Sequence, residues 1–328
     1  MKHCMVTGCS GFVGSRIATA LLARGLSVRG LTRQVAGAQV NPCVELFHGD
    51  LTKSSSLHGA ASGIDTLFHA AGYAHSYAGN NDLHRQITLE GTRNLLAEAR
   101  DNEVQRIVFI SSIKAMAEPG EDCADENSVG MPNDAYGLAR LQAEQLVLEY
   151  GRQSGMHVSI LRPTLVYGPG CKGNLASLLR WIDRGWFPPL PDTGNRRSMV
   201  DVRDVVHAAL QAADRDSANG KVCILSDGED YSTRRIYLAI RRAFGKSDPV
   251  WSLPAGVMRM LGKCGDGYEA LLGREALYNS AMCSRLLDSA CYRSVNAEIV
   301  LGFRPEYRFE DALPGMVAAY RGNVHEQK

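Results

Sequence analysis

The stretch Thr7-Gly8-Cys9-Ser10-Gly11-Phe12-Val13-Gly14 decides the fold of this 328-residue chain. The apolar run before it, residues 3–6, predicts a short buried strand, and residues 12–22 after it predict a helix. Glycines between a strand and a helix let the backbone approach a pyrophosphate, which the first amides of the helix then face. Although the same glycines would also suit a turn without a ligand, the context predicts a dinucleotide site. Its expected residues are Gly8, Ser10, Gly11, Phe12, Val13 and Gly14.

The composition is that of an ordinary globular protein, with 45% hydrophobic and 22% charged residues. A net charge of +1 gives no reason to expect a nucleic-acid or acidic-membrane partner. No apolar run is long enough to span a bilayer, and we expect no signal peptide before the first strand. The nine cysteines are dispersed and lack metal spacing, which predicts free thiols and no metal site. We therefore expect a cytoplasmic protein.

Short apolar runs alternate with helical patterns through the first half of the chain. This alternation predicts an α/β fold, a doubly wound parallel sheet of the Rossmann type with helices on both faces. Further strands are expected at residues 27–31, 44–47, 66–70, 106–111 and 157–161, and helices at 82–100 and 136–153. Ligands of such sheets bind beyond the carboxyl ends of the strands.

Prolines and glycines cluster at residues 162–173 and 186–194, where we expect the chain to leave for a second, smaller lobe. Residues 200–213 then predict a helix, and residues 221–226 predict one more strand of the main sheet. The expected dinucleotide-binding domain covers residues 1–166, and residues 198–227 return to it. The expected substrate lobe, mostly helical and C-terminal, covers residues 167–197 and 228–328.

A serine, a tyrosine and an arginine predict the chemistry of this fold. Ser112 ends the strand expected at 106–111, and Tyr136 and Arg140 lie four positions apart, on one face of the next helix. A phenol exchanges protons near neutral pH only where a nearby cation favours the phenolate. A serine hydroxyl can hydrogen-bond an oxygen on which charge develops. These three residues are the expected catalytic set, although a helix with a tyrosine in its first turn and an exposed arginine would give the same pattern.

The glycine spacing G-x-x-G-x-x-G after Thr7, together with this catalytic pattern, resembles the extended short-chain dehydrogenase/reductase family, of NAD-dependent epimerase/dehydratase type. The likeness is closest to UDP-sugar 4-epimerases and UDP-4-keto-6-deoxy-N-acetylhexosamine 4-reductases. That family uses Tyr-x-x-x-Lys, so Arg140 is a departure. Arginine keeps the charge and can donate to ribose hydroxyls, but it does not pass on a proton as lysine does. The resemblance aligns Ser112, rather than Ser111, with the catalytic hydroxyl.

The end of the second strand bears on the choice of cofactor. NAD-preferring relatives place an acidic residue there, whereas this chain has Thr32-Arg33, which suits a 2′-phosphate. We therefore expect a preference for NADP(H), with NAD(H) possible. The resemblance implies further cofactor contacts by Asp50 and Leu51, by Ala70, Ala71 and Gly72, and by Tyr136, Arg140 and Pro163.

The resemblance continues through the segment from Arg162 to Gly170 into the second lobe. There it implies a nucleotide-sugar substrate whose diphosphate contacts Asn174 and Leu175. Arg197 is the matching phosphate ligand, and Arg285 with Asp288 resembles a pair that clamps phosphate and uridine ribose. We also expect Lys114 to contact the substrate. The remaining alternative for each arginine is a solvated surface position.

The loop after Ser112 reduces the number of reactions that the resemblance allows. Sugar dehydratases of this family place Asp-Glu where this chain has Ile113-Lys114, which leaves 4-epimerases and 4-keto reductases. Arg33 favours NADP(H)-dependent reduction of the 4-keto group of a UDP-linked sugar for bacterial surface polysaccharide. Alternatives are an NAD-dependent 4-epimerase, a catalytically weakened NADP-binding scaffold, and a steroid- or aldehyde-type reductase. The resemblance also implies a homodimer through the helices at 82–100 and 136–153.

Overall fold

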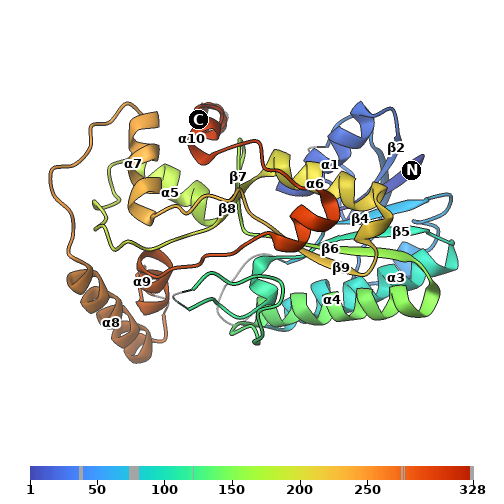
Figure 1. Ribbon diagram of the computed structural model, residues 1–328, viewed down its shortest axis with the longest axis horizontal. Coiled ribbons are helices and arrows are strands. Elements are labelled where there is room, and N and C mark those ends of the chain that lie inside the picture. The colour runs from blue at the N-terminus through green and yellow to red at the C-terminus, as the bar shows by residue number, and fades with distance from the viewer. Residues whose placement is uncertain (37–39, 74–80, 121, 275, 277, 326–328) are drawn as a thin grey trace.

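The computed structural model describes residues 1–36, 40–73, 81–120, 122–274, 276 and 278–325. At its centre lies a seven-stranded parallel sheet with the order β3-β2-β1-β4-β5-β6-β9 (Figure 1). The strands are β1 His3–Thr7, β2 Ser27–Thr32, β3 Glu45–His48, β4 Thr66–His69, β5 Arg106–Ile110, β6 His157–Pro163 and β9 Lys221–Leu225. Two short strands, β7 Leu165–Tyr167 and β8 Met199–Asp201, pair beside this sheet. The predicted doubly wound sheet is confirmed.

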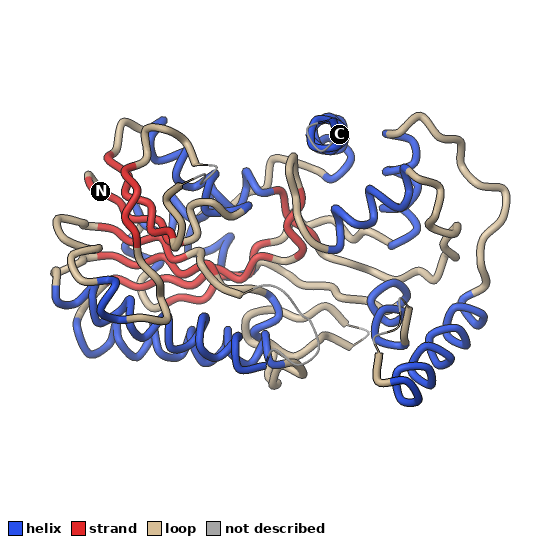
Figure 2. Tube along the Cα trace, turned by 180° about the vertical axis from the view of Figure 1, so that it is seen from behind, coloured by secondary structure: helices blue, strands red, loops and turns tan. Residues whose placement is uncertain are grey.

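Helices cover both faces of the sheet, with α1 and α6 on one face and α3 and α4 on the other (Figures 1 and 2). Their bounds are α1 Phe12–Ala23, α2 Asn81–Leu83, α3 Gly91–Asp101, α4 Ala135–Ser154 and α6 Val202–Asp214. The second lobe carries α5 Asn174–Asp183, α7 Thr233–Ala243, α8 Ala255–Leu272, α9 Ser280–Leu287 and α10 Phe309–His325. None of the described helices is both long and apolar enough to cross a bilayer.

Two helical predictions differ from the structure. The helix expected at 82–100 is interrupted, because a π-helical stretch, His84–Glu90, separates α2 from α3. The helix expected at 200–213 begins only at Val202, because Val200 and Asp201 belong to β8. Asp201 has extended backbone and its carboxylate accepts a hydrogen bond from the Arg203 amide at 2.8 Å, the geometry of an N-cap. The polar cap therefore sets the start of α6.

The strand order creates a crevice at one end of the sheet. β1 lies between β2 and β4, so Thr7 is paired with Leu31 on one side and with His69 on the other. The chain winds outward from β1 in both directions, and the loops after β1 and β4 diverge at this point. Such a switch point at the carboxyl ends of parallel strands is where ligands of doubly wound sheets bind.

Two of the apolar cores, one in the second lobe and one beside the sheet, receive residues from the C-terminal part of the chain. The residues of the lobe core include Tyr167, Leu175, Leu179, Ile182, Tyr231, Tyr237 and Phe309. The hydroxyls of Tyr167 and Tyr231 both donate to the buried carboxylate of Asp227, at 2.9 and 2.8 Å. Late in the chain, Ala297, Leu301 and Phe303 pack instead into the core beside the sheet. The C-terminal part of the chain therefore contributes to both cores.

The cysteines require a correction. All nine were expected as free thiols, but the structure joins Cys123 to Cys291 in a disulfide, 168 residues apart in sequence. Their segments lie side by side, because the Ala124 amide donates to the Cys291 carbonyl and the Arg293 amide to the Ala124 carbonyl. Spacing along the chain cannot reveal a pair that only the fold brings together. Asp230 lies within 4.8 Å of both sulfurs, but the disulfide leaves no thiolate there to bind a metal.

A buried histidine connects β1, β4 and α3. The Ala71 amide donates to Thr7 Oγ1 (3.1 Å), and Thr7 Oγ1 lies 2.7 Å from His69 Nδ1. On its other side, His69 Nε2 lies 2.9 Å from Thr92 Oγ1, which donates to the Thr88 carbonyl at 2.5 Å. Since Thr92 uses its proton on that carbonyl, His69 must donate from Nε2 and accept at Nδ1. Burial, and then the charge of Arg140, lower the pKa of His69 to about 3, so the ring is neutral.

We predict that this neutral ring makes the fold sensitive to acid. The unfolded chain binds a proton at His69 below about pH 6.5, whereas the folded chain does not until about pH 3. Stability from His69 is therefore complete above pH 6.5 and is lost as the pH falls. Between pH 7.5 and 5.5, wild type should lose about 1.4 kcal/mol more unfolding free energy than His69→Gln, by urea denaturation. His58→Gln removes an exposed histidine and should leave that loss intact; an equal loss in His69→Gln would contradict the neutral ring.

Candidate active site

The glycine loop after β1 forms a cradle that side chains would fill. Gly8 has φ +69°, and a Cβ there would come within 2.9 Å of the Ala71 amide nitrogen. A Cβ on Gly14 would collide with the Gly8 carbonyl oxygen. The Gly11 amide donates to that carbonyl at 2.8 Å, and no side chain caps the start of α1. The open amides and close backbone fit a pyrophosphate, which would also be near Ser10, Phe12 and Val13 in this loop.

The other part of the predicted dinucleotide site lies at the carboxyl ends of β2 and β3. Thr32 is paired with His48, which brings exposed Arg33 toward Asp50. Burial acts to raise the pKa of Asp50, but hydrogen bonds from Thr52 and the charges of Arg33 and Lys53 lower it below its usual value. Leu51 is buried in the adjacent core. Arg33 and Asp50 thus share one electrostatic neighbourhood.

The start of α4 brings Tyr136 to the loop after β5. Asp134 caps this helix, and its carboxylate accepts from the Gly137 amide at 2.7 Å. A Cβ on Gly137 would collide with the Lys114 carbonyl, so the glycine lets the first turn of α4 approach that loop closely. Ser112 caps the short helical turn in the same loop, where its Oγ accepts from the Lys114 amide at 3.2 Å. The structure therefore places Tyr136 in a turn that packs against the segment carrying Ser112.

Arg140 occupies the place between the ends of β4 and β5. Its guanidinium donates from Nη1 to the Ile110 carbonyl at 3.1 Å and lies over the rings of Phe109 and Tyr136, at 5.8 and 5.4 Å. A Cβ on Gly72 would collide with Nη2, so glycine is needed for the guanidinium to fit. Arg140 Nε is buried and has no hydrogen-bond partner among the described residues. A buried donor of this kind fits a ligand hydroxyl, such as that of a ribose.

Three contributors to this site went unnoticed in the sequence. His84 packs edge-on against Tyr136 with 5.6 Å between ring centres, and its buried Nδ1 has no partner in the described chain. Asp134 and Gly137 were also missed. The acidic residue directly before a helical pattern was a readable capping signal for Asp134. The contact of Gly137 with Lys114 and that of His84 with Tyr136 depend on the fold and had no such signal.

Charged residues from both lobes meet around Arg197. Lys114 forms an ion pair with Glu118, which lowers the pKa of that carboxyl, and Arg197 lowers it further. Arg197 Nη1 donates to the Asp288 carbonyl at 3.2 Å. Burial lowers the pKa of Arg197, and the nearby charge of Arg285 acts in the same direction. The structure thus brings Lys114, Arg197, Arg285 and Asp288 into one electrostatic cluster, which has the charge expected of an anion site.

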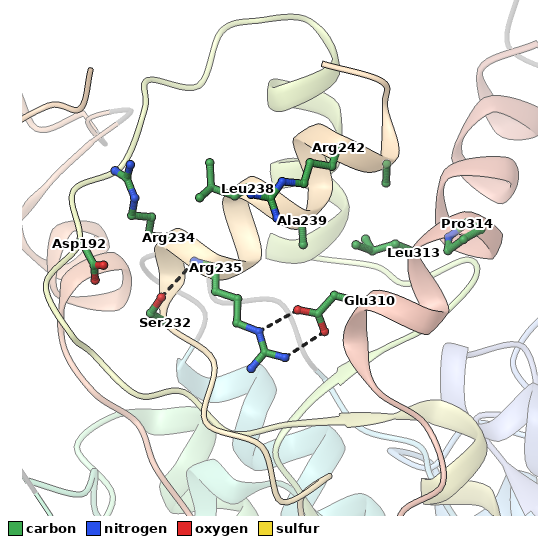
Figure 3. A pocket seen from close by; sticks show the side chains of 11 residues that line it. Asp192, Ser232, Arg234, Arg235, Leu238, Ala239, Arg242, Glu310, Leu313 and Pro314 are labelled. Atoms are coloured by element: carbon green, nitrogen blue, oxygen red, sulfur yellow. Dashed lines mark hydrogen bonds and ion pairs between the residues drawn. The ribbon is translucent and has the colours of Figure 1, made fainter. Parts of the chain in front are cut away.

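The other predicted residues occupy different environments. Asn174 is exposed at the first turn of α5, whereas the side chain of Leu175 is buried in the lobe core. Pro163 ends β6 and is buried. A separate cavity of about 540 Å³ lies between α7 and α10, where Ser232, Arg235 and Glu310 are among its lining residues (Figure 3). It contains none of the predicted site residues, and Glu310 already pairs with Arg235.

Comparisons with known proteins agree on the family. Residues 4–225 match the model of the NAD dependent epimerase/dehydratase family. The chain is 33% identical over 267 residues to a UDP-glucose 4-epimerase of Vibrio cholerae, covering 78% of this chain and 79% of that one. It is 30% identical over 274 residues to the 4-hydroxy-2-methyl-3-oxo-4-farnesyl-3,4-dihydroquinoline-1-oxide ketoreductase of Stigmatella aurantiaca, covering 80% and 79%. The crystal structure of gox2253 is similar with a TM-score of 0.82 and 25% identity, covering 98% and 99%.

The close approach at Gly14 leads to a prediction for Gly14→Ala. Because the new methyl group collides with the Gly8 carbonyl, we expect a loss of about 1–3 kcal/mol in stability. The turn should also open, so the dissociation constant for NADPH should rise at least about tenfold in a fluorescence titration. Gly267→Ala is the matched control, because a methyl group there meets nothing within 4 Å. Its helix should be unchanged or up to about 1 kcal/mol more stable. Unaltered binding by Gly14→Ala would refute the cradle.

Proposed function

This chain belongs to the NAD-dependent epimerase/dehydratase family, and from that premise we propose that it reduces the 4-keto group of a nucleotide-diphosphate sugar with NADPH. Family membership makes it an NAD(P)-dependent oxidoreductase or epimerase of the extended short-chain dehydrogenase type. The observation that carries the proposal is the position of Arg140, between Gly72 in the loop after β4 and the ring of Tyr136. The proposal includes a UDP-linked substrate, a cytoplasmic location and a homodimer through α3 and α4.

The residues of the site have distinct roles in this proposal. A nicotinamide cofactor, when bound, supplies the hydride. Tyr136 protonates the oxygen at C4, and the Ser112 hydroxyl donates a hydrogen bond to that oxygen as negative charge develops. The guanidinium of Arg140, 5.4 Å from the Tyr136 ring centre, favours the phenolate that proton transfer leaves behind. Since arginine does not give up its proton, Arg140 positions and stabilises but does not relay protons.

The electrostatic cluster of Lys114, Arg197, Arg285 and Asp288 supports an anionic substrate. Arg197, Arg285 and Lys114 approach from two lobes, and one carboxylate, Glu118, already pairs with Lys114. Burial of the Arg197 guanidinium and the nearby charge of Arg285 both disfavour its positive charge, so an anion bound there would be stabilising. A diphosphate provides that compensation and hydrogen-bonds guanidinium groups bidentately. We therefore assign the diphosphate of the substrate to Arg197 and Arg285, with Asp288 and Asn174 on the nucleotide side.

The cofactor preference is the first testable part. Arg33 is exposed beside the end of β2, and the carboxylate of Asp50 near it accepts hydrogen bonds from Thr52. Arg33→Ala should weaken NADPH binding by about 1–3 kcal/mol and leave NADH binding nearly unchanged. Isothermal titration with both cofactors measures the difference. Arg100→Ala, which removes an exposed arginine from the end of α3, should change neither constant. Equal affinity of wild type for the two cofactors would exclude the preference.

A nucleotide-sugar 4-epimerase is the second candidate. It is favoured by the 33% identity to a UDP-glucose 4-epimerase, whereas the 30% identity to a ketoreductase favours reduction. The same Tyr136 and Ser112 would serve both reactions, because each passes through a 4-keto sugar. What differs is whether the cofactor returns to its starting state. Net consumption of cofactor therefore separates the two candidates.

We expect one NADPH to be oxidised for each UDP-4-keto-6-deoxy-N-acetylhexosamine reduced, as followed by absorbance and chromatography. Tyr136→Phe should lower that rate about 10²–10⁴-fold, because the proton donor is lost. Interconversion of 4-epimeric UDP-sugars with no net NADPH consumption would instead establish the epimerase. Absence of both reactions would leave a cofactor-binding scaffold.

The two adjacent serines provide a matched control for this experiment. Ser112→Ala should lower the rate about 10²–10³-fold, whereas Ser111→Ala should remain close to wild type. Ser111 Oγ is buried and has no partner among the described residues, so it is placed against the protein interior. Reversed effects of the two changes would assign the catalytic hydroxyl to Ser111.

A further inference from the structure

The disulfide between Cys123 and Cys291 lies where the connection from β5 to α4 meets the second lobe. Cys123 belongs to that connection, which has Ser112 at its start and Tyr136 directly after its end. Cys291 follows α9 and comes just after Asp288 in the sequence. The bond therefore links the loop between two proposed catalytic residues to the segment that carries a proposed substrate ligand.

Besides the bond, the two segments share a small apolar core. Ile113 and Met116 of the loop pack there with Ala124, and Tyr292 joins them from the other segment. The Ala124 amide donates to the carbonyl that precedes Tyr292 at 3.0 Å, and the Ala124 carbonyl accepts from the amide that follows it at 2.9 Å. These contacts are noncovalent and can open and close, whereas the disulfide fixes the junction.

On its other side, the segment tied by the disulfide pairs with the residues around Arg197. The Ala290 amide donates to the Arg196 carbonyl at 2.7 Å, and the Ser198 amide donates to the Ala290 carbonyl at 3.0 Å. The Arg197 side chain donates from Nη1 to the Asp288 carbonyl at 3.2 Å. The proposed diphosphate ligand is therefore positioned by the same segment that the disulfide joins to the loop.

The surroundings of the two sulfurs suit thiol–disulfide exchange. Cys291 is buried, whereas Cys123 is partly exposed, so an incoming thiolate can approach the sulfur of Cys123. Asp230 lies within 4.8 Å of both sulfurs, and its carboxylate pairs with Arg293 at 3.2 Å and with Arg196 at 4.0 Å. Two guanidinium groups beside one carboxylate favour the thiolate that leaves when the bond breaks.

We propose that this disulfide is an exchange site for a dithiol and that its state controls the affinity of the substrate side. A thiolate of the dithiol attacks the sulfur of Cys123, and Cys291 leaves as a thiolate that takes up a proton. The second thiolate of the dithiol then attacks the mixed disulfide and releases Cys123. The dithiol is thereby oxidised to a disulfide and the protein is reduced by the same two electrons; the reverse exchange closes the bond again.

A cytoplasmic location, as proposed above, favours this reading over a permanent structural bond. Disulfides in a reducing compartment are usually transient and redox-sensing, because thiol pools there compete for them. The effect on substrate affinity rests on the proposed function, whereas the exchange and the loosening of the loop do not.

Differential alkylation tests the exchange on the folded protein. Free thiols are blocked with N-ethylmaleimide, the excess is removed, the protein is treated with dithiothreitol and a chelator, and released thiols are labelled with iodoacetamide. We expect new labels on Cys123 and Cys291. The chelator keeps a metal from bridging the released thiolates and Asp230. A bond that dithiothreitol opens only after unfolding in urea would overturn the exchange.

Hydrogen exchange measures the loosening without any substrate. Reduction should speed the exchange of peptides that contain the Ala124 and Arg293 amides at least about tenfold, because their pairing is no longer held covalently. Peptides of β1 and the glycine loop are the internal reference and should be unchanged. Equal exchange of the Ala124 and Arg293 peptides in the two redox states would show that the bond does not hold the loop.

Titration with UDP measures the effect on the substrate side. Reduced wild type should bind UDP about tenfold more weakly than oxidised wild type, and both should bind NADPH equally well. Cys123→Ser with Cys291→Ser should behave as the reduced protein and ignore the dithiol. The matched control, Cys43→Ser with Cys264→Ser, replaces two exposed free cysteines and should respond as wild type does.

The comparison between the two redox states of wild type does not depend on how well a variant folds. Equal UDP affinity of the two states would overturn the control of the substrate side. Absence of UDP binding in both states would instead contradict the nucleotide-sugar substrate, while the alkylation and hydrogen-exchange results would still decide whether the disulfide is an exchangeable lock on the loop.

Discussion

The neutral imidazole of His69 is the constraint on which the cofactor end of the sheet depends. It joins the end of β1 to the end of β4 through Thr7, and β4 to the start of α3 through Thr92. The same Thr7 hydroxyl accepts from the Ala71 amide, which a side chain on Gly8 would contact. A charged ring could not make this set of bonds, because its second proton would face the hydroxyl proton of Thr7. The two loops expected to hold the cofactor are therefore held together by one uncharged side chain.

Arg140 lies near this neutral ring and acts on its pKa. The guanidinium lies close enough to His69 that its charge lowers the pKa of the ring, which helps to keep the imidazole neutral. It fits only because Gly72, directly after the loop that His69 positions, has no side chain. Lysine would carry a similar charge on a narrower side chain without a planar group to lie over Phe109 and Tyr136. The departure from the family pattern is thus accommodated by the packing around it.

The sequence could predict what depends on local pattern. The order of strands and helices and the glycine turn follow from periodicity and turn residues, and helical spacing places Tyr136 and Arg140, chosen by the family resemblance, on one face of α4. It could not predict contacts between distant segments. The disulfide of Cys123 with Cys291 and the packing of Gly137 on Lys114 each join residues that only the fold brings together. The start of α6 was missed for a local reason, because the capping role of Asp201 outweighed the apolar periodicity around it.

The distribution of charge also depends on the fold and not on the sequence alone. A net charge of +1 describes the whole chain and gives no reason to expect an anionic partner, yet charge acts over about a Debye length of roughly 8–10 Å. At that scale the molecule is not neutral. Arg285 lies close enough to Arg197 that its charge lowers the pKa of that guanidinium, and the carboxylates of Glu118 and Asp288 act on Arg197 in the opposite direction. What the chain binds is therefore governed by the spacing of its charges in the fold and not by their sum.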